Sequence, residues 1–117
     1  MPNKIIQLDQ VFQALTDPTR RAVLERLSRG PASTLELARP FDMALPSFTQ
    51  HLSVLERFGL VKSKKFGRVR TYELAPKRLQ EAEDWIAGQR KIWESRLDRL
   101  EDYLHNLEKE KGSSDGE

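Results

Sequence analysis

The chain has 117 residues, of which 38% are hydrophobic and 32% charged, so it is long enough for one domain with a modest core. It contains no cysteine, which excludes disulfides, thiolate metal sites and cysteine nucleophiles. No apolar run approaches the roughly 18 residues of a membrane span, and the first residues lack the apolar core of a signal peptide. We therefore expect a cytoplasmic protein that has no membrane partner.

The formal net charge of +2 is unevenly distributed along the chain. Residues 1–75 carry 12 Lys or Arg against 7 Asp or Glu, whereas residues 76–117 carry 8 against 11. The basic excess therefore falls in the larger, N-terminal part of the chain. This is the sign of charge expected of a surface that faces nucleic acid.

Two helices are predicted before residue 30. Apolar residues recur at helical spacing over Ile5–Leu15. Asp17 and Pro18 then suit the N-cap and the first position of a second helix, which ends near residue 28. Arg20 and Arg21 follow at this helix N-terminus, where they either contact a DNA phosphate or pair with acids of their own helix. The sequence leaves both alternatives open.

A helix-turn-helix is predicted next. Ser33 and Glu36 form a capping box, which begins a short helix over Thr34–Arg39. After a tight connector, Pro46 suits the first position of a longer helix, and Gly59 is a typical helix stop. A short helix, a turn and a second helix in this order form the helix-turn-helix of many DNA-binding proteins, although other small helical domains share the spacing.

The longer helix has two different faces. Phe48, Leu52 and Leu55 recur at helical spacing and are predicted to pack on the core. The opposite face is polar and poor in acid, which suits a major groove, and its predicted DNA contacts are Ser47, Thr49, Gln50, Ser53 and Arg57. Gln50 is the residue that we expect to read a base, by a bidentate contact to adenine. Each of these side chains, taken singly, is also compatible with an ordinary solvent-facing role. His51 is expected to buttress the helix, since no partner for catalysis is evident.

The stretch from Leu60 to Leu74 changes to a strand pattern, with two short strands around a turn near Gly67. Four cations lie close to its tip: Lys64, Lys65, Arg68 and Arg70. A basic hairpin that directly follows a recognition helix is interpreted as a wing, whose cations contact phosphate or a neighbouring minor groove. The alternative is a solvated edge hairpin that its lysines protect from aggregation.

One long helix is predicted over residues 76–109, because Leu79, Ile86, Trp93, Leu100 and Leu107 recur every seven residues. A domain of this size cannot easily cover so broad an apolar surface, so we predict a homodimer interface shared with the first helix. Its expected residues are Leu8, Val11, Phe12, Trp85, Ile86, Trp93, Leu97, Leu100 and Leu104. The alternative is a helix packed wholly inside the monomer. Residues 111–117 are predicted to form a disordered tail.

Several segments together resemble a known family. They are Phe12–Arg21 (FQALTDPTRR), Leu37-Ala38, Thr49–Glu56 (TQHLSVLE), Gly59-Leu60-Val61 and Gly67-Arg68. With these motifs at this spacing, the chain resembles the ArsR-type winged-helix repressors of bacteria over roughly residues 8–75, and the terminal helix fits in kind. The resemblance implies a dimeric repressor that binds a short inverted repeat in double-stranded DNA. The recognition helix would enter the major groove, with the wing beside it.

Members of this family often release DNA on binding a metal, but this chain departs from both kinds of metal site. The cysteine-bearing site would fall around Leu35–Leu37, where no cysteine stands. At the site on the terminal helix, His105 and Glu108 match the later half, whereas Ile92 and Glu94 stand where an acidic residue and a histidine belong. A single histidine with carboxylates is a weak zinc site. We therefore expect the branch of the family that does not sense metal, with no cofactor and an unidentified effector.

The expected fold is mainly α with a small β-hairpin: a winged helix-turn-helix in one domain over residues 1–110. Within it, the helix-turn-helix spans 33–58, the wing 60–75 and the dimerisation helix 76–109. The predicted function is a sequence-specific DNA-binding transcriptional regulator, a homodimeric repressor of an inverted-repeat operator. The alternative is a protein-interaction module that uses the long helix without specific DNA binding, and the basic wing favours the first. No nucleophile–base pair, phosphate loop or metal cluster is visible, so we do not expect an enzyme.

Overall fold

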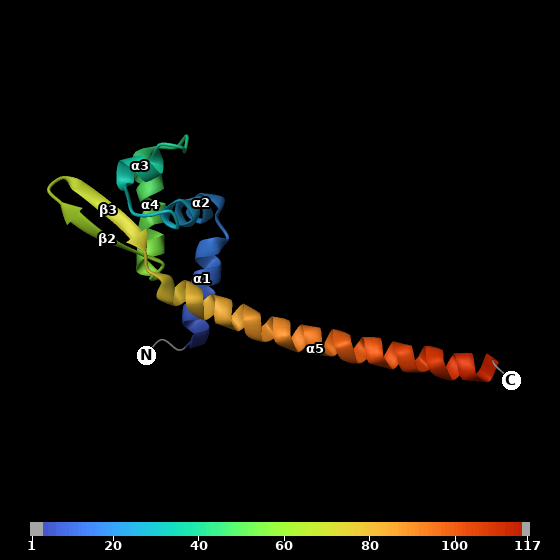
Figure 1. Ribbon diagram of the computed structural model, residues 1–117. Coiled ribbons are helices and arrows are strands. Elements are labelled where there is room, and N and C mark those ends of the chain that lie inside the picture. The colour runs from blue at the N-terminus through green and yellow to red at the C-terminus, as the bar shows by residue number, and fades with distance from the viewer. Residues whose placement is uncertain (1–3, 116–117) are drawn as a thin grey trace. The chain divides into compact units, whose positions relative to one another are not determined.

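The computed structural model describes residues 4–115, and the side chains of residues 7–111 (Figure 1). The backbone divides after Ala82 into two units. The elements in chain order are α1 (Lys4–Leu15), α2 (Pro18–Leu27), β1 (Ala32–Ser33), α3 (Thr34–Ala38), α4 (Leu45–Arg57), β2 (Val61–Phe66), β3 (Val69–Leu74) and α5 (Pro76–Asp115). The predicted fold class, mainly α with a hairpin and a long terminal helix, is confirmed.

Local capping interactions begin two of the short helices where the sequence predicted them. The Asp17 carboxylate accepts a hydrogen bond from the Arg20 backbone N–H at 3.0 Å, and Pro18 follows at the first position of α2. Before α3, the Ser33 hydroxyl accepts from the Glu36 N–H, and the Glu36 carboxylate accepts from the Ser33 N–H, each at 3.2 Å. These bonds satisfy donors that a helix start otherwise leaves without a partner.

Helix α4 ends in a Schellman motif built on Gly59. This glycine has φ +79°, a conformation that costs glycine little because it has no Cβ. The Leu60 N–H donates to the Leu55 carbonyl at 2.9 Å, and the Gly59 N–H donates to the Glu56 carbonyl at 3.0 Å. The chain thus turns sharply from α4 into β2, which lies against the same helix (Figure 1).

The sheet has three antiparallel strands in the order β1-β3-β2. The hairpin of β2 and β3 was predicted, but β1 was not. Ala32 pairs with Tyr72, and Ser33 pairs with Thr71. A two-residue strand has no alternation that a sequence could display, so only its pairing with β3 reveals it. Strand β1 fixes one side of β3 and places the start of α3 beside the hairpin.

The first unit encloses a hydrophobic core to which every element up to the start of α5 contributes a residue. Phe48, Leu52 and Leu55 of α4 have no exposed surface, as predicted from their spacing. The other buried members are Val11, Ala14, Val23, Leu24, Leu27, Ala32, Leu37, Leu60, Val61, Tyr72 and Ala82. Because α4 turns its apolar side inward, its polar side is left facing outward.

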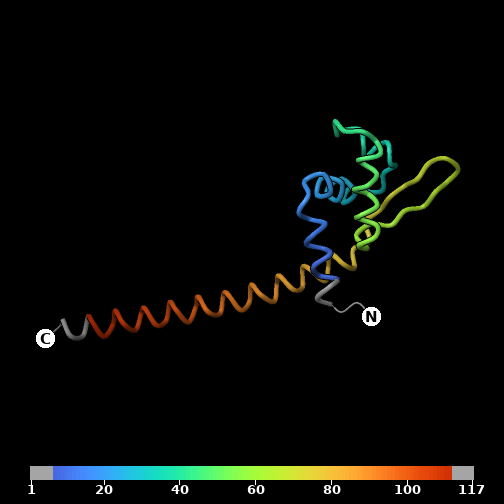
Figure 2. Tube along the Cα trace, turned by 180° about the vertical axis from the view of Figure 1, so that it is seen from behind, coloured from blue at the N-terminus to red at the C-terminus, as the bar shows by residue number. Residues whose placement is uncertain are grey.

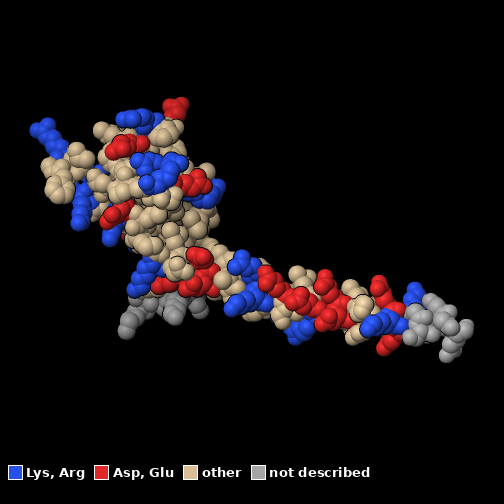
Figure 3. All heavy atoms as spheres, in the orientation of Figure 1, with Lys and Arg blue, Asp and Glu red and all other residues tan. Residues whose placement is uncertain are grey.

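The second unit is the continuation of α5. From Arg90 to Lys111 every side chain is exposed, including Trp93, Leu97 and Leu100. Figure 3 shows cationic and acidic side chains interspersed along this helix. The helix runs to Asp115, so the predicted helix end at 109 and the predicted disordered tail over residues 111–115 are wrong. Glycine and serine lower helix propensity near a helix end without forbidding a further turn. The last two residues of the predicted tail lie outside the described residues.

Candidate nucleic-acid interface

The outward side of α4 carries a row of polar side chains. Ser47, Gln50, Ser53 and Arg57 recur every three or four residues, and all four are exposed. Thr49 stands at the edge of the row: it is half-buried, and its hydroxyl donates to the Pro46 carbonyl at 3.0 Å. The row contains no acidic residue, so its surface can approach a polyanion without like-charge repulsion.

Helix α3 packs against α4, and the connector between them is fixed by stacked rings. The centroids of Phe41 and Phe48 lie 5.3 Å apart, with 29° between the ring planes. Phe48 is fully buried, so this contact ties the connector to the core at the start of α4. The N-terminal end of α4, where the polar row begins, is thereby held in place by side chains on both sides of the turn.

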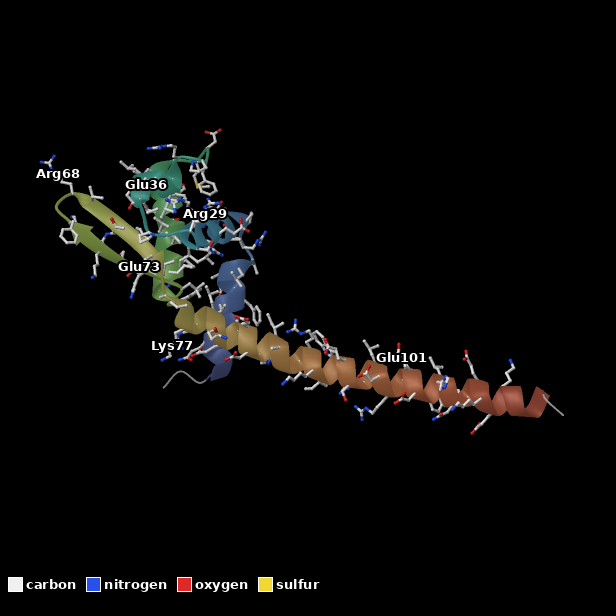
Figure 4. The ribbon with its side chains drawn as sticks, in the orientation of Figure 1. Arg29, Glu36, Arg68, Glu73, Lys77 and Glu101 are labelled. Carbon is white, nitrogen blue, oxygen red and sulfur yellow. The ribbon has the colours of Figure 1, made fainter. Side chains whose placement is uncertain are left out.

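The hairpin of β2 and β3 (the wing) lies beside α4 and ends in a tight turn at Gly67, whose φ is +59° (Figure 2). Lys64, Lys65 and Arg68 are all exposed there. Figure 4 shows the Arg68 side chain at the tip, directed away from the helices, and Figure 3 shows cationic side chains on this side of the molecule. Nearer the base, Lys62 pairs instead with Glu73 at 3.4 Å.

Arg70 differs from Lys64, Lys65 and Arg68 because its side chain is hydrogen-bonded within the wing. Its Nη1 donates to the Ser63 hydroxyl at 2.8 Å, and that hydroxyl donates to the Glu56 carboxylate of α4 at 2.6 Å. This chain of hydrogen bonds connects both strands of the wing to α4. Burial, followed by the nearby Glu56 charge, raises the pKa of Tyr72, which pairs with Ser63 across the hairpin.

The wing tip also exposes two apolar side chains that sequence reasoning had not singled out. Phe66 and Val69 form the last cross-strand pair before the turn, with exposed fractions of 79% and 52%. Their position next to Gly67, where no further element can cover them, was the signal that could have identified them. The tip therefore combines cations with apolar surface.

Arg20 and Arg21 both cap the end of α1, a role that was not considered for them from the sequence. Arg20 donates from Nε to the Ala14 carbonyl at 2.8 Å and from Nη2 to the Gln13 carbonyl at 3.2 Å. Arg21 donates from Nη1 to the Leu15 carbonyl at 2.6 Å. Cations at a helix C-terminus satisfy its last carbonyls and match the helix dipole.

The remaining guanidinium nitrogen of Arg20 reaches α4, where Nη1 lies 3.3 Å from His51 Nδ1. The same imidazole nitrogen lies 3.6 Å from the Asp17 carboxylate. Burial opposes ionisation of Asp17, but the Arg20 backbone N–H and the neighbouring His51 and Arg20 charges outweigh it, so its pKa lies below the usual value. This half-buried cluster joins α1, α2 and α4.

The predicted dimer residues fall into three groups. Those on α5, from Trp85 to Leu104, are exposed. Leu8 and Phe12 on α1 are half-buried. Val11 has 1% of its surface exposed and belongs to the core of the first unit. The prediction that it lies in a dimer interface is therefore wrong. On an amphipathic helix with a core on one side, Val11 points inward and its neighbours lie at the edge of that face.

His105 and Glu108, the remnant of a metal-site pattern, are both exposed. Across residues with described side chains, no three His, Asp or Glu residues gather in a way that could hold a metal ion. No helix within the described residues is long and apolar enough to cross a membrane.

The helix-turn-helix with its outward polar row, followed by a basic hairpin, defines a winged helix-turn-helix protein. A family model described as a helix-turn-helix domain matches residues 15–64. The chain is 46% identical over 68 residues to the HTH-type transcriptional regulator Rv2034 of Mycobacterium tuberculosis, a match that covers 58% of this chain and 64% of that relative. It is 30% identical over 79 residues to the transcriptional repressor SdpR of Bacillus subtilis, covering 68% of this chain and 88% of that one.

A solved structure extends the likeness beyond the helix-turn-helix. The crystal structure of the ArsR family transcriptional regulator RHA00566 is 54% identical and superposes with a TM-score of 0.75, covering 81% of this chain and 98% of that one. The chain belongs to the ArsR family of winged helix-turn-helix transcriptional regulators.

Proposed function

We propose that the protein is a sequence-specific DNA-binding repressor that places α4 in the major groove and the wing along the adjacent backbone. The observation that carries this proposal is the exposed row of Ser47, Gln50, Ser53 and Arg57 on a helix whose other face is fully buried. Gln50 is the base reader in this proposal, because its amide both donates and accepts, as adenine requires. One of the relatives is named a transcriptional repressor, which supports repression rather than activation.

In the wing, Lys64, Lys65 and Arg68 contact phosphate, and their exposed side chains support this role. The bonds from Arg70 to Ser63 and onward to Glu56 support a different task for Arg70, which is to hold the wing against α4. Thr49 contacts DNA at the edge of the row, with the part of its side chain that is exposed. These assignments separate residues that read sequence from residues that supply affinity.

The proposed active form is a homodimer in the cytoplasm, and its operator is an inverted repeat. Support for a dimer comes from the apolar side chains that α5 exposes, which include Trp93, Leu97, Leu100 and Leu104. Leu8 and Phe12 of α1 are kept in the proposed interface and Val11 is removed from it. A two-fold dimer presents two copies of α4, so its operator repeats in inverted orientation.

Selection of duplexes from a random-sequence pool tests this proposal directly. We expect an enriched inverted repeat, bound with an affinity that falls steeply as salt rises. Gln50→Ala should relax preference at one base pair of each half-site, at a cost of about 1–3 kcal/mol. Arg68→Ala should weaken binding to all sequences and reduce the salt slope by about one.

Lys62→Ala is the matched control for the wing, because Lys62 already pairs with Glu73 at the hairpin base. It should leave the salt slope nearly unchanged. A pool without enrichment would contradict specific DNA binding and favour the alternative, a protein-interaction module built on α5. If Gln50→Ala and Arg68→Ala both lowered affinity without changing preference, Gln50 would not be the base reader.

A further inference from the structure

The side chain of His51 occupies an unusual position on α4. It directly follows Gln50, yet it faces the start of α2 rather than solvent, and 23% of its side chain is exposed. Two charged groups reach its Nδ1, one from α2 and one from the N-cap of that helix: Arg20 at 3.3 Å and Asp17 at 3.6 Å. The first distance is within hydrogen-bond range, whereas the second is too long for a hydrogen bond.

The hydrogen bond with Arg20 requires one particular form of the imidazole. A guanidinium has only donors, so Nδ1 must accept the hydrogen bond from Arg20 Nη1. An accepting Nδ1 belongs to the neutral ring with its proton on Nε2. Protonation would place a second donor opposite Arg20, and the nearest acceptor for it is the Asp17 carboxylate, in a different direction. Neutral and protonated His51 therefore have different partners.

Arg20 cannot follow His51 freely, because its other nitrogens are bonded to the Ala14 and Gln13 carbonyls at the end of α1. The guanidinium is a fixed point between α1 and α4. A helix is rigid over one residue step, so the contact at His51 also sets the position of the Gln50 backbone. A bidentate contact to a base tolerates little displacement, because hydrogen bonds weaken steeply with poor distance and angle.

We propose that His51 is a positioning residue for sequence reading: its neutral Nδ1, bonded to Arg20, holds α4 in the orientation that Gln50 needs. This rests on the proposed function, and it adds a residue that does not itself touch DNA. The ratio of affinity for the selected duplex to affinity for a random-sequence duplex is the quantity that His51 controls.

Two substitutions separate positioning from simple packing. Asparagine places an acceptor oxygen where histidine has Nδ1 and does not titrate, whereas glutamine carries its amide at the position of Nε2. We expect His51→Asn to keep the affinity ratio of the wild type at about pH 8, and His51→Gln to lower it about tenfold, the effect of losing one charge-assisted hydrogen bond. Circular dichroism and thermal unfolding of both variants establish that each is folded.

A matched control separates this role from the general effect of replacing a histidine. The chain has two histidines, and His105 is exposed on α5. His105→Gln should therefore keep the affinity ratio of the wild type, whereas His51→Gln should lower it.

The outcomes distinguish this inference from the function on which it rests. If the wild type discriminates but His51→Gln discriminates as well as His51→Asn, the positioning role is wrong and specific binding stands. The same holds if His105→Gln lowers the affinity ratio as much as His51→Gln. A wild type without preference for the selected duplex overturns the proposed function and the inference together.

Discussion

The two units of the chain use apolar side chains in opposite ways. In the first unit, Phe48, Leu52 and Leu55 are fully enclosed by neighbouring elements of the same chain. In the second unit, Trp93 and Leu100 are about half exposed on a single helix, at 54% and 51%. The first unit buries most of its hydrophobic residues in its own core, apart from a few such as those at the wing tip, whereas the second has a continuous apolar surface to bury against another molecule.

This difference bears on how each unit contributes to function. A closed core gives α4 a fixed position, which sequence reading requires. Burial of its exposed apolar stripe favours association of α5 with another molecule. Association with a second copy of the chain would present two copies of α4 to DNA. The following predictions test whether the two units are as different as their burial indicates.

The largest expected effect is on the free energy of unfolding, and it is tested by truncating one leucine in each unit to alanine. Leu52→Ala removes a fully buried side chain and should destabilise the protein by about 3–5 kcal/mol at every protein concentration. Leu100→Ala should destabilise it only at concentrations where the dimer is populated, because its contacts belong to the associated state. Urea unfolding over a range of protein concentrations measures both. An equal, concentration-independent loss for the two variants would mean that Leu100 is buried within one chain.

Next in size is the effect of a charge placed on the exposed stripe. Trp93→Glu should weaken dimerisation by about 2–4 kcal/mol, the usual cost of losing a central aromatic contact, and shift the protein toward monomer in sedimentation. Lys91→Glu reverses a charge on the opposite side of α5 and is the matched control, which should leave the dimer intact. A folded Trp93→Glu dimer of wild-type affinity would move the interface elsewhere.

A glycine from each unit gives a third contrast. Gly59→Ala should destabilise the protein by more than about 1 kcal/mol, because alanine is strained at φ +79°. Its Cβ would also lie 3.2 Å from Arg78 Cγ. Gly88→Ala, inside α5 where the added Cβ meets no atom within 4 Å beyond the adjoining helix backbone, should instead stabilise the helix by about 0.5–1 kcal/mol. Thermal unfolding of the two variants should therefore shift in opposite directions.

The smallest predicted effect concerns acid. The pKa of Asp17 is lowered in the folded state, despite burial, by the Arg20 N–H and nearby positive charge. Its carboxylate therefore stabilises the fold at neutral pH, and this contribution is lost as pH falls through the folded-state pKa. Asp17→Ala should cost about 1 kcal/mol at neutral pH and less in acid. Asp102→Ala, exposed in the second unit, is the control, and a similar pH profile for both variants would contradict this role of Asp17.

Much of the fold was predictable because its signals are local. Asp17 with Pro18, the Ser33–Glu36 box and Gly59 each act within a few residues, so the sequence displays them directly. The spacing of Phe48, Leu52 and Leu55 fixed the inward face of α4 and hence its outward row. The motifs shared with the ArsR family were likewise read from the chain, and the comparisons confirm the membership.

Tertiary structure decided what depends on partners distant in sequence. Strand β1 exists through its pairing with β3, and Val11 is buried because other helices cover it. Arg70 bonds to Ser63, which in turn bonds to Glu56, and Arg20 reaches His51 across 31 positions, contacts that no local period encodes. The sequence by itself determined where helices begin, which faces they hide and which family the chain resembles. Only the packed structure decided which charged side chains hold the fold together and which remain exposed at the candidate DNA interface, because hydrogen-bond partners are chosen by proximity in space.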